Sequence, residues 1–215
     1  MRRLLTTTLT AAALAASALF TGVAPANAAA MQVTAGFMIE GATSFCTVSF
    51  TDPRTPTLAY TASHCYKPGT STAVHLGNQR LGDFIPEISN RDLDLIAIRL
   101  NSGIRGSKVL QSGEPLLSTW VPKPGTTVCK YGATTQETCG TVLASEDDRF
   151  TVRMAADHGD SGAPIYQRLD TKEEHGVHLV GTVIAESKED PTVIICTPMT
   201  SIQAFLGNTF GSWRM

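Results

Sequence analysis

Residues 158–164 read His-Gly-Asp-Ser-Gly-Ala-Pro and place Ser161 within a run of small residues that favour turns. Glycine permits a tight backbone bend that other residues adopt only at a cost. Such a bend directs the amides of Gly159 and Ser161 toward the serine hydroxyl, which is the geometry of a nucleophile beside an oxyanion hole. A polar surface turn is the alternative, because Gly, Asp and Ser are common in turns. A serine hydroxyl also needs a base to take its proton, so the rest of the chain decides between the two interpretations.

The first 28 residues have the pattern of a secretory signal peptide. Two arginines follow Met1, an apolar stretch runs to Phe20, and Ala26-Asn27-Ala28 ends the segment. Threonines interrupt the apolar stretch and argue against a membrane anchor. We therefore predict a secreted, extracellular protein that is cleaved after about Ala28, with a fold formed by the remaining 187 residues.

The mature sequence is mildly acidic. Without Arg2 and Arg3, 15 Lys and Arg residues face 19 Asp and Glu residues, which gives a net charge near −4. The sequence has no basic stripe that would attract nucleic acid. It also has no second apolar run that is long enough to span a bilayer. We expect a monomer with neither a nucleic-acid partner nor a membrane span.

The five cysteines favour a disulfide framework, because disulfides are stable in exported proteins. The sequence contains no Cys-x-x-Cys motif, so we expect no zinc site, and nothing else in it calls for a metal or a cofactor. Pairing of neighbours along the chain gives Cys46–Cys65 and Cys129–Cys139. Cys196 lies in the apolar run 193–196, and we interpret it as a buried, unpaired thiol.

Short β-type segments separated by turn residues recur from Val33 onward, a pattern that favours a sandwich or a barrel. One set covers residues 45–50, 57–61, 72–76 and 95–100. A second set covers residues 116–121, 126–131, 140–144, 150–154, 163–166, 177–185 and 192–196. The polar segment 101–113 separates the sets, so we predict an all-β chain with one barrel in residues 29–113 and another in 114–215.

The C-terminal end is the one stretch with helical spacing. Ile202, Phe205 and Leu206 share a face, and we expect Ser201 to cap the helix and Gly207 to end it. The sequence therefore predicts a short C-terminal helix that packs its apolar face on the body of the protein.

His64 and Asp94 are the candidate base and the carboxylate that orients it. His64 follows an apolar strand and adjoins Cys65, which a disulfide would hold in place. Asp94 adjoins the apolar run 95–98, and a carboxylate that orients an imidazole is usually buried. We interpret Asp92 as a solvated residue. His158 adjoins the serine segment, and we expect it to line the binding cleft.

Three motifs together resemble the chymotrypsin-like (trypsin-like) serine peptidases. They are Thr-Ala-Ser-His-Cys around His64, Asp-Leu-Ile-Ala-Ile from Asp94, and Gly-Asp-Ser-Gly-Ala-Pro around Ser161, in the chain order of that family. Residues 128–140 are similar to the disulfide loop of the bacterial branch, which includes α-lytic protease and the streptogrisins. The resemblance covers about residues 33–206. It implies two six-stranded antiparallel barrels with the active site between them.

The resemblance also implies roles for individual residues. Ser161 would attack the scissile carbonyl, His64 would transfer the proton, and Asp94 would hold the imidazole. The amides of Gly159 and Ser161 would bind the oxyanion. In the bacterial branch a basic residue after the first loop cysteine pairs with the acid before the nucleophile, which implies a buried Lys130–Asp160 pair here.

The resemblance also implies a substrate pocket that is lined by Ala155, His158, Ile184, Ala185, Glu186 and Thr192. Ile184 stands where the family usually has a serine that supports the catalytic acid, so we expect that acid to have one hydrogen bond fewer. Glu186 stands where the pocket edge usually has glycine. The base of the pocket, at Ala155, has no aspartate. We therefore expect a small or medium apolar side chain at the cleavage site.

These observations predict a secreted serine endopeptidase that cleaves peptide or protein substrates through an acyl-enzyme. A catalytically silent homologue that acts as a secreted binding protein is the alternative, because Ile184 and Glu186 depart from the family pattern. An esterase of the α/β-hydrolase class does not fit. That class has Gly-x-Ser-x-Gly and a histidine after the serine, whereas His64 precedes Ser161.

Overall fold

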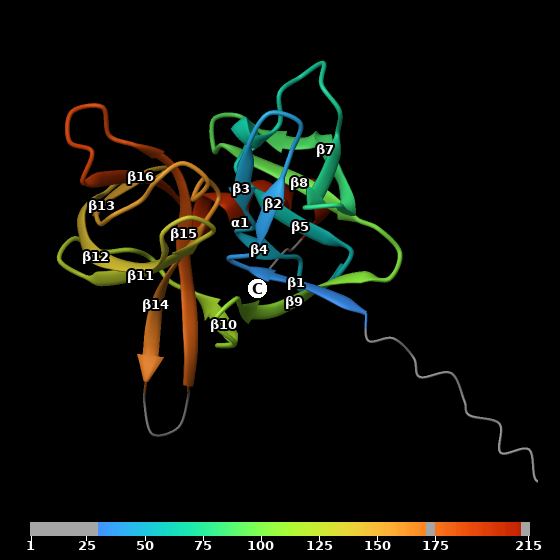
Figure 1. Cartoon of the computed structure of the whole chain (residues 1–215). Coiled ribbons are helices and arrows are strands. Elements are labelled where there is room, and N and C mark those ends of the chain that lie inside the picture. Colours follow the sequence, from blue (N-terminus) through green and yellow to red (C-terminus); the bar gives the residue numbers. More distant parts are fainter. Residues whose placement is uncertain (1–29, 171–174, 212–215) are drawn as a thin grey trace, which may run out of the picture.

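Runs of β-branched and aromatic residues form short strands, which are joined by turns and followed by an α-helix near the C-terminal end (Figure 1). The structure is a computed structural model and describes residues 30–170 and 175–211. The predicted signal peptide, residues 1–28, lies outside the described residues. Within the described residues, no helix is both long and apolar enough to cross a membrane.

The elements of the first half are β1 (Met31–Ala35), β2 (Met38–Glu40), β3 (Phe45–Thr47), β4 (Phe50–Thr51), β5 (Leu58–Thr61), the 3-10 turn η1 (Ser63–Cys65), β6 (Ala73–Leu76), β7 (Gln79–Asn90), β8 (Leu95–Leu100) and β9 (Ile104–Leu110). Those of the second half are β10 (Leu116–Thr119), β11 (Thr127–Gly132), β12 (Gln136–Ser145), β13 (Phe150–Arg153), β14 (Pro164–Asp170), β15 (His175–Glu186), β16 (Val193–Pro198) and α1 (Met199–Phe210).

The second half forms a closed barrel. Its antiparallel strands follow the order β15-β14-β11-β12-β13-β16, and β16 pairs with β15 to complete the circle. Strand β10 lies outside this ring and pairs with β15 in parallel. Val142, Phe150, Ile165, Val180 and Ile194 fill the interior, because alternate residues of each strand point inward.

The first half forms a second curved sheet, and Figure 1 shows the two sheets as separate lobes. Its strands follow the order β3-β2-β6-β7-β8-β5-β4. The edge strands β3 and β4 are separated in the chain by Val48 and Ser49 alone, so one interrupted stretch forms both edges. Ile39, Val48, Leu81, Phe84 and Ile98 form its core. The two-barrel architecture predicted from the sequence is therefore the observed fold, while the division of the chain between residues 113 and 114 stays a prediction.

The polar segment 101–113, which we interpreted from the sequence as the separation between the two sets of strands, contains a strand of its own. Residues Ile104–Leu110 form β9, which pairs in parallel with β1. Strand β7 was also missed, because Pro86 and a register shift between Ile85 and Ser89 interrupt its alternation. Pairing with β8 on one side and β6 on the other holds β7 in an extended conformation despite these interruptions.

The helix α1 starts earlier and ends later than predicted. Pro198 precedes its first turn and Gly211 follows its last, so Ser201 and Gly207 lie inside the helix. The Ser201 hydroxyl donates to Asp147 O (2.8 Å) and therefore does not cap the helix. A glycine inside a helix costs about 1 kcal/mol, which the burial of the neighbouring Leu206 can offset.

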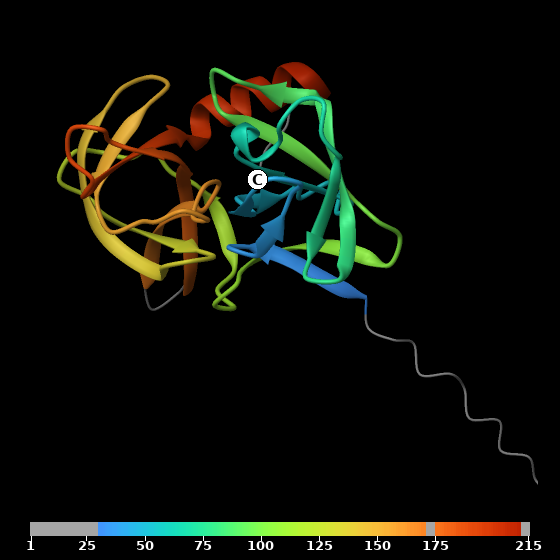
Figure 2. The same cartoon turned by 45° about the horizontal axis from the view of Figure 1, so that its top comes forward.

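One hydrophobic cluster joins the two sheets and the helix. It contains Phe50 and Tyr60 from the first half, Leu179 from the second half and Ile202 from α1, all fully buried. Figure 2 shows α1 leaving the second barrel and running over the first lobe. The Arg54 guanidinium also donates to Gly211 O (3.3 Å). The helix thus contacts both halves and helps to hold them together.

Candidate active site

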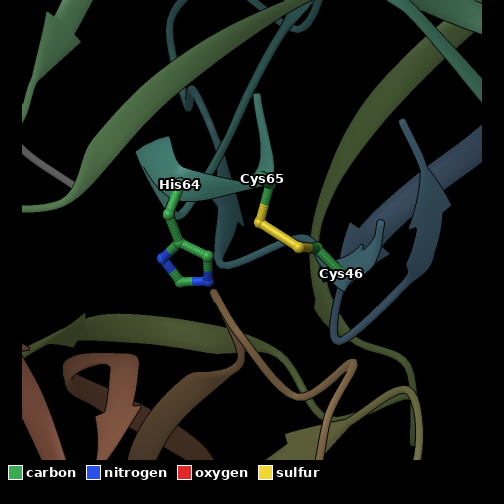
Figure 3. Close-up of side chains that lie close together, drawn as sticks. All are labelled: Cys46, His64 and Cys65. Atoms are coloured by element: carbon green, nitrogen blue, oxygen red, sulfur yellow. A yellow bond between two sulfur atoms is a disulfide. The ribbon is translucent and has the colours of Figure 1, made fainter. Parts of the chain in front are cut away.

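A disulfide fixes the turn that carries His64. The 3-10 turn η1 follows β5, and its Cys65 is bonded to Cys46 on β3. Figure 3 shows the His64 imidazole beside this disulfide. A covalent link between η1 and β3 restricts the backbone on which the imidazole depends.

Asp94 orients the His64 ring. Its Oδ2 lies 2.6 Å from His64 Nδ1, and its Oδ1 accepts hydrogen bonds from the His64 amide (2.9 Å) and from Ser63 Oγ (2.7 Å). The Asp94 side chain is 14% exposed, whereas that of His64 is 46% exposed. With Nδ1 donating to Asp94, the lone pair of the neutral ring is on Nε2, the atom that can accept a proton.

These contacts shift both pKa values. The hydrogen bond with Asp94 raises the pKa of His64 above its ordinary value and outweighs the opposite effect of burial. Burial alone would raise the pKa of Asp94, but the hydrogen bonds from His64 and Ser63 lower it overall. Asp94 therefore stays ionised at neutral pH and stabilises the imidazolium form of His64.

Ser63 supplies a hydroxyl to Asp94 that the sequence comparison did not identify. We expected Asp94 to have one hydrogen bond fewer because Ile184 stands in place of the usual serine. In the structure the Ser63 Oγ donates to Asp94 Oδ1, so the carboxylate accepts three hydrogen bonds from η1. The position of Ser63 directly before His64 is the signal that could have indicated this contact.

The loop before Ser161 leaves two backbone amides free. Thr134 Oγ1 donates to His158 O (2.6 Å), and the Ala163 amide donates to Asp160 O (2.8 Å). The N–H of a trans peptide points away from its own carbonyl, so the amides of Gly159 and Ser161 point away from these contacts. Within the described ranges, neither amide donates to another protein group.

Glycine is required at two positions of this loop. Gly159 and Gly162 have φ angles of +101° and +83°, a region that other residues rarely adopt. A Cβ atom at Gly159 would also collide with the Phe45 ring, and one at Gly162 with the carbonyl of Thr47. The small residues of the motif therefore permit both the bend and its close packing against β3.

A buried ion pair lies beneath the loop. Lys130 on β11 and Asp160 are fully buried, with Lys130 Nζ 2.9 Å from Asp160 Oδ2. Lys130 also donates to Thr135 Oγ1, which donates in turn to Asp160 Oδ2 (2.6 Å). The Thr134 amide donates to Asp160 Oδ1 (2.9 Å). Burial acts to raise the pKa of Asp160, but the bonds from Lys130 and Thr135 lower it overall.

The disulfide Cys129–Cys139 links the strands that lead into this ion-pair network. The two cysteines face each other across β11 and β12, and the hairpin between them carries Lys130, Thr134 and Thr135. The same two pairs of cysteines were expected from the sequence. Cys196 is a buried free thiol whose pKa is raised, chiefly by burial.

Thr47 connects the first sheet to the serine loop, a role that the sequence did not reveal. Its amide donates to Ser161 O (2.8 Å), and its hydroxyl donates to Gly159 O (2.8 Å). The same hydroxyl accepts from the Ala133 amide (2.9 Å). Thr47 follows Cys46 directly, so one short strand holds both the disulfide beside His64 and the loop that carries Ser161.

His64 and Ser161 line one cavity of about 330 Å³. Ile184, Ala185, Glu186 and His158 line it as well, together with Ala156, Asp157 and Val183. Ala155 and Thr192, which were assigned to the pocket, do not belong to its lining. The His158 side chain is 97% exposed and lies at the rim. In the part of the chain that the structure describes, no hydrogen bond joins Ser161 to His64.

Two groups of possible metal-ligating side chains occur within the described residues. One is Cys46, His64 and Cys65, and the other is Cys129, Glu137 and Cys139. The cysteines in both groups are bonded as disulfides, whereas metal binding by cysteine requires a thiolate. Neither group offers a normal set of metal ligands.

Comparison with known proteins agrees with this arrangement. No protein-family model matches the chain. The uncharacterized protein Rv1815 of Mycobacterium tuberculosis (strain ATCC 25618 / H37Rv) is 34% identical over 164 residues, which cover 69% of this chain and 74% of that protein. A similarly matched protein, MT1863 of strain CDC 1551 / Oshkosh, is also 34% identical and also uncharacterized.

Several solved structures share the fold. A glutamic acid-specific serine protease has a TM-score of 0.65 at 22% identity and matches 81% of this chain and 98% of its own. Protease A of Thermobifida fusca has a TM-score of 0.62 at 18% identity, over 82% of this chain and 96% of its own. The α-lytic protease homologue N4 has a TM-score of 0.63 at 19% identity, over 82% of this chain and 98% of its own. The chain therefore belongs to one family with Rv1815 and has the fold of the bacterial chymotrypsin-like serine proteases.

Proposed function

We propose that this protein is a secreted serine endopeptidase that hydrolyses peptide bonds through an acyl-enzyme. One observation carries the proposal. His64, with its ring held at 2.6 Å from Asp94, lines the same cavity as Ser161, beside two amides that have no acceptor among the described residues. These are the parts that acyl transfer needs: a nucleophile, an oriented base and donors for an oxyanion.

In the proposed first step, Ser161 Oγ attacks the carbonyl carbon of the scissile bond while His64 Nε2 takes the hydroxyl proton. The Gly159 and Ser161 amides bind the oxyanion of the tetrahedral intermediate. The intermediate then expels the amine, which receives the proton from His64, and an ester on Ser161 remains. A water molecule then attacks the ester carbonyl, with His64 again taking the proton. The ester bond to Ser161 breaks, His64 returns the proton to Ser161 Oγ, and the carboxylic acid product is released.

Asp94 assists both proposed steps without transferring a proton itself. It holds the ring with Nδ1–H toward itself and stabilises the positive charge that the imidazole acquires. No hydrogen bond joins Ser161 to His64 in the described structure. Such bonds are often long in unliganded enzymes and tighten only when substrate binds.

The cavity beside Ser161 supports a preference for a side chain of small or medium size. Its volume is about 330 Å³, and Val183, Ile184 and Ala185 give one wall an apolar character. Glu186 lies at the edge of this cavity and is exposed. Residues 29–113 and 114–215 would then act as two barrels with the scissile bond between them.

A catalytically silent, secreted binding protein is the second candidate. Ile184 and Glu186 line the cavity where the resemblance expects serine and glycine, and the lack of a Ser161–His64 hydrogen bond among the described residues fits a silent site as well. This candidate predicts peptide binding without any covalent chemistry at Ser161.

A fluorophosphonate probe distinguishes the two candidates. The mature protein, beginning near Ala29, should become labelled at Ser161, whereas Ser161→Ala and heat-denatured protein should not. A peptide library then tests turnover, with His64→Ala as the control that keeps the serine. Absence of labelling in folded protein would refute the endopeptidase and support the silent homologue, and labelling without peptide hydrolysis would point to a blocked pocket.

A further inference from the structure

A second cavity lies on the other side of His64. It has a volume of about 780 Å³, more than twice that of the cavity beside Ser161. Its lining comes from three stretches of the first half, namely residues 63–68 with η1, residues 86–96 with β7 and β8, and Thr43. His64 lines both cavities, so a chain bound across Ser161 passes beside this second space.

Two cationic side chains, Lys67 and Arg91, line this cavity. Neither forms an ion pair or a side-chain hydrogen bond with any described residue. Glu87 and Asp92 are neighbours in the sequence but do not contribute to the lining. The one acid in the lining, Asp94, already accepts three hydrogen bonds from Ser63 and His64. The lining therefore carries two cations against one carboxylate, and neither cation has an ion-pair partner among the described residues.

The cavity beside Ser161 has the opposite character. Its charged lining residues are Asp157 and Glu186, both exposed, together with the titratable His158. A bound peptide thus meets negative charge on one side of His64 and positive charge on the other. This difference provides a means of selecting substrates by the placement of their charges.

We propose that the Lys67–Arg91 cavity binds a carboxylate side chain, Asp or Glu, of the peptide substrate. The inference rests on the proposed endopeptidase function and extends it to the class of substrate. Arg91 offers a guanidinium fork that matches a carboxylate, and Lys67 offers a mobile ammonium group. Because the cavity begins at His64, the acidic residue would lie about one to three residues from the bond that is cut.

The effect on selectivity is moderate, because both cations are exposed to solvent. An exposed ion pair near the middle of the usual range contributes about two- to threefold in binding, so two such contacts give an acidic peptide an advantage of about three- to tenfold over its amide isostere. Salt screens exposed charges, so this advantage should shrink between low and high ionic strength.

The first test compares peptides that differ only by Asp against Asn, or Glu against Gln, at each of three positions on either side of the scissile bond. We expect one position at which the acid raises kcat/KM by about three- to tenfold. In the double variant Lys67→Ala/Arg91→Ala the ratio should fall to about one. The matched control, Arg99→Ala/Lys108→Ala, removes two exposed cations that lie outside the cavity and should keep the ratio.

The second test does not depend on turnover. Fluorescence anisotropy measures binding of the same peptide pairs to Ser161→Ala, with and without the Lys67→Ala/Arg91→Ala changes. Tighter binding of the acidic peptide, lost in the cavity variant and weakened by salt, supports the inference even if labelling of Ser161 fails. Equal binding of acid and amide peptides overturns the inference, whether or not Ser161 is labelled.

Discussion

Replacement of Lys130 by methionine is a direct test of the network beneath the serine loop. Methionine has a similar length but no charge, so Asp160 would keep a buried carboxylate with no cation beside it. Breaking a buried pair by removing one partner costs about 3–5 kcal/mol. For a domain of this size, 1 kcal/mol shifts the melting temperature by about 2–4 °C, so we expect a fall of about 6–20 °C.

The loss of stability in Lys130→Met should depend on pH in a defined direction. The pKa of Asp160 is lowered in the folded protein, so its contribution to stability is present above the ordinary carboxyl pKa and is lost as the pH falls through the folded value. In Lys130→Met, burial would raise that pKa, and protonation would relieve the unpaired charge. The difference in unfolding free energy between wild type and variant should therefore be largest near neutral pH and should narrow on acidification.

Urea unfolding at several pH values measures the stability, and the rate of fluorophosphonate labelling measures the loop. The double variant Lys130→Met/Asp160→Asn removes both charges and should recover part of the lost stability. Lys108→Met, an exposed lysine on β9, serves as the control. Unchanged unfolding and labelling in Lys130→Met would refute the idea that this pair holds the oxyanion loop.

Three further predictions concern the residues around His64 and Ser161. Because the base must be neutral and the hydrogen bond to Asp94 raises the pKa of His64, kcat/KM should increase with pH, with a midpoint above 6.5; a midpoint below that value would contradict the observed pair. Ser63→Ala should lower the unfolding free energy by about 1–2 kcal/mol and slow labelling, since Asp94 loses a hydrogen bond, whereas Ser63→Thr keeps the hydroxyl and should retain both. Thr47→Val should cost about 2–4 kcal/mol in urea unfolding because one buried and one partly buried hydrogen bond of the Thr47 hydroxyl are lost, whereas Thr47→Ser keeps the hydroxyl; a Thr47→Val protein as stable as Thr47→Ser would exclude this role.

The local motifs could be predicted from the sequence because each depends on neighbouring residues. The glycines of 158–164 indicate a turn, and the apolar run after Asp94 indicates a strand. The spacing of Ile202, Phe205 and Leu206 reports a helix, although its ends were misplaced by several residues. The helix begins after Pro198 and ends at Gly211, a glycine with a φ of +71° whose amide donates to Gly207 O, while the Ser201 hydroxyl bonds to Asp147 O inside the helix.

Contacts between segments that are distant in the sequence could not be predicted from it. The position of β9 beside β1 and the long strand β7 follow from pairing, which compensates for polar residues and for Pro86. Thr47 is an ordinary strand residue in the sequence, and its link to Gly159 exists only because β3 packs against the serine loop. The Lys67–Arg91 cavity likewise exists only because the segment that follows η1 lies close to the β7–β8 connection in the folded chain.

The sequence by itself determined the two-barrel class, the cysteine pairs, the helix and the identity of the three candidate residues, because turn chemistry and strand periodicity act over a few residues. The tertiary structure alone decided how Asp94 is hydrogen bonded, which residues line the cavity beside Ser161, and where the unpaired cations lie. These features depend on side chains from segments that are distant in the sequence, either within the first sheet or between the two sheets, and no local pattern encodes such distances.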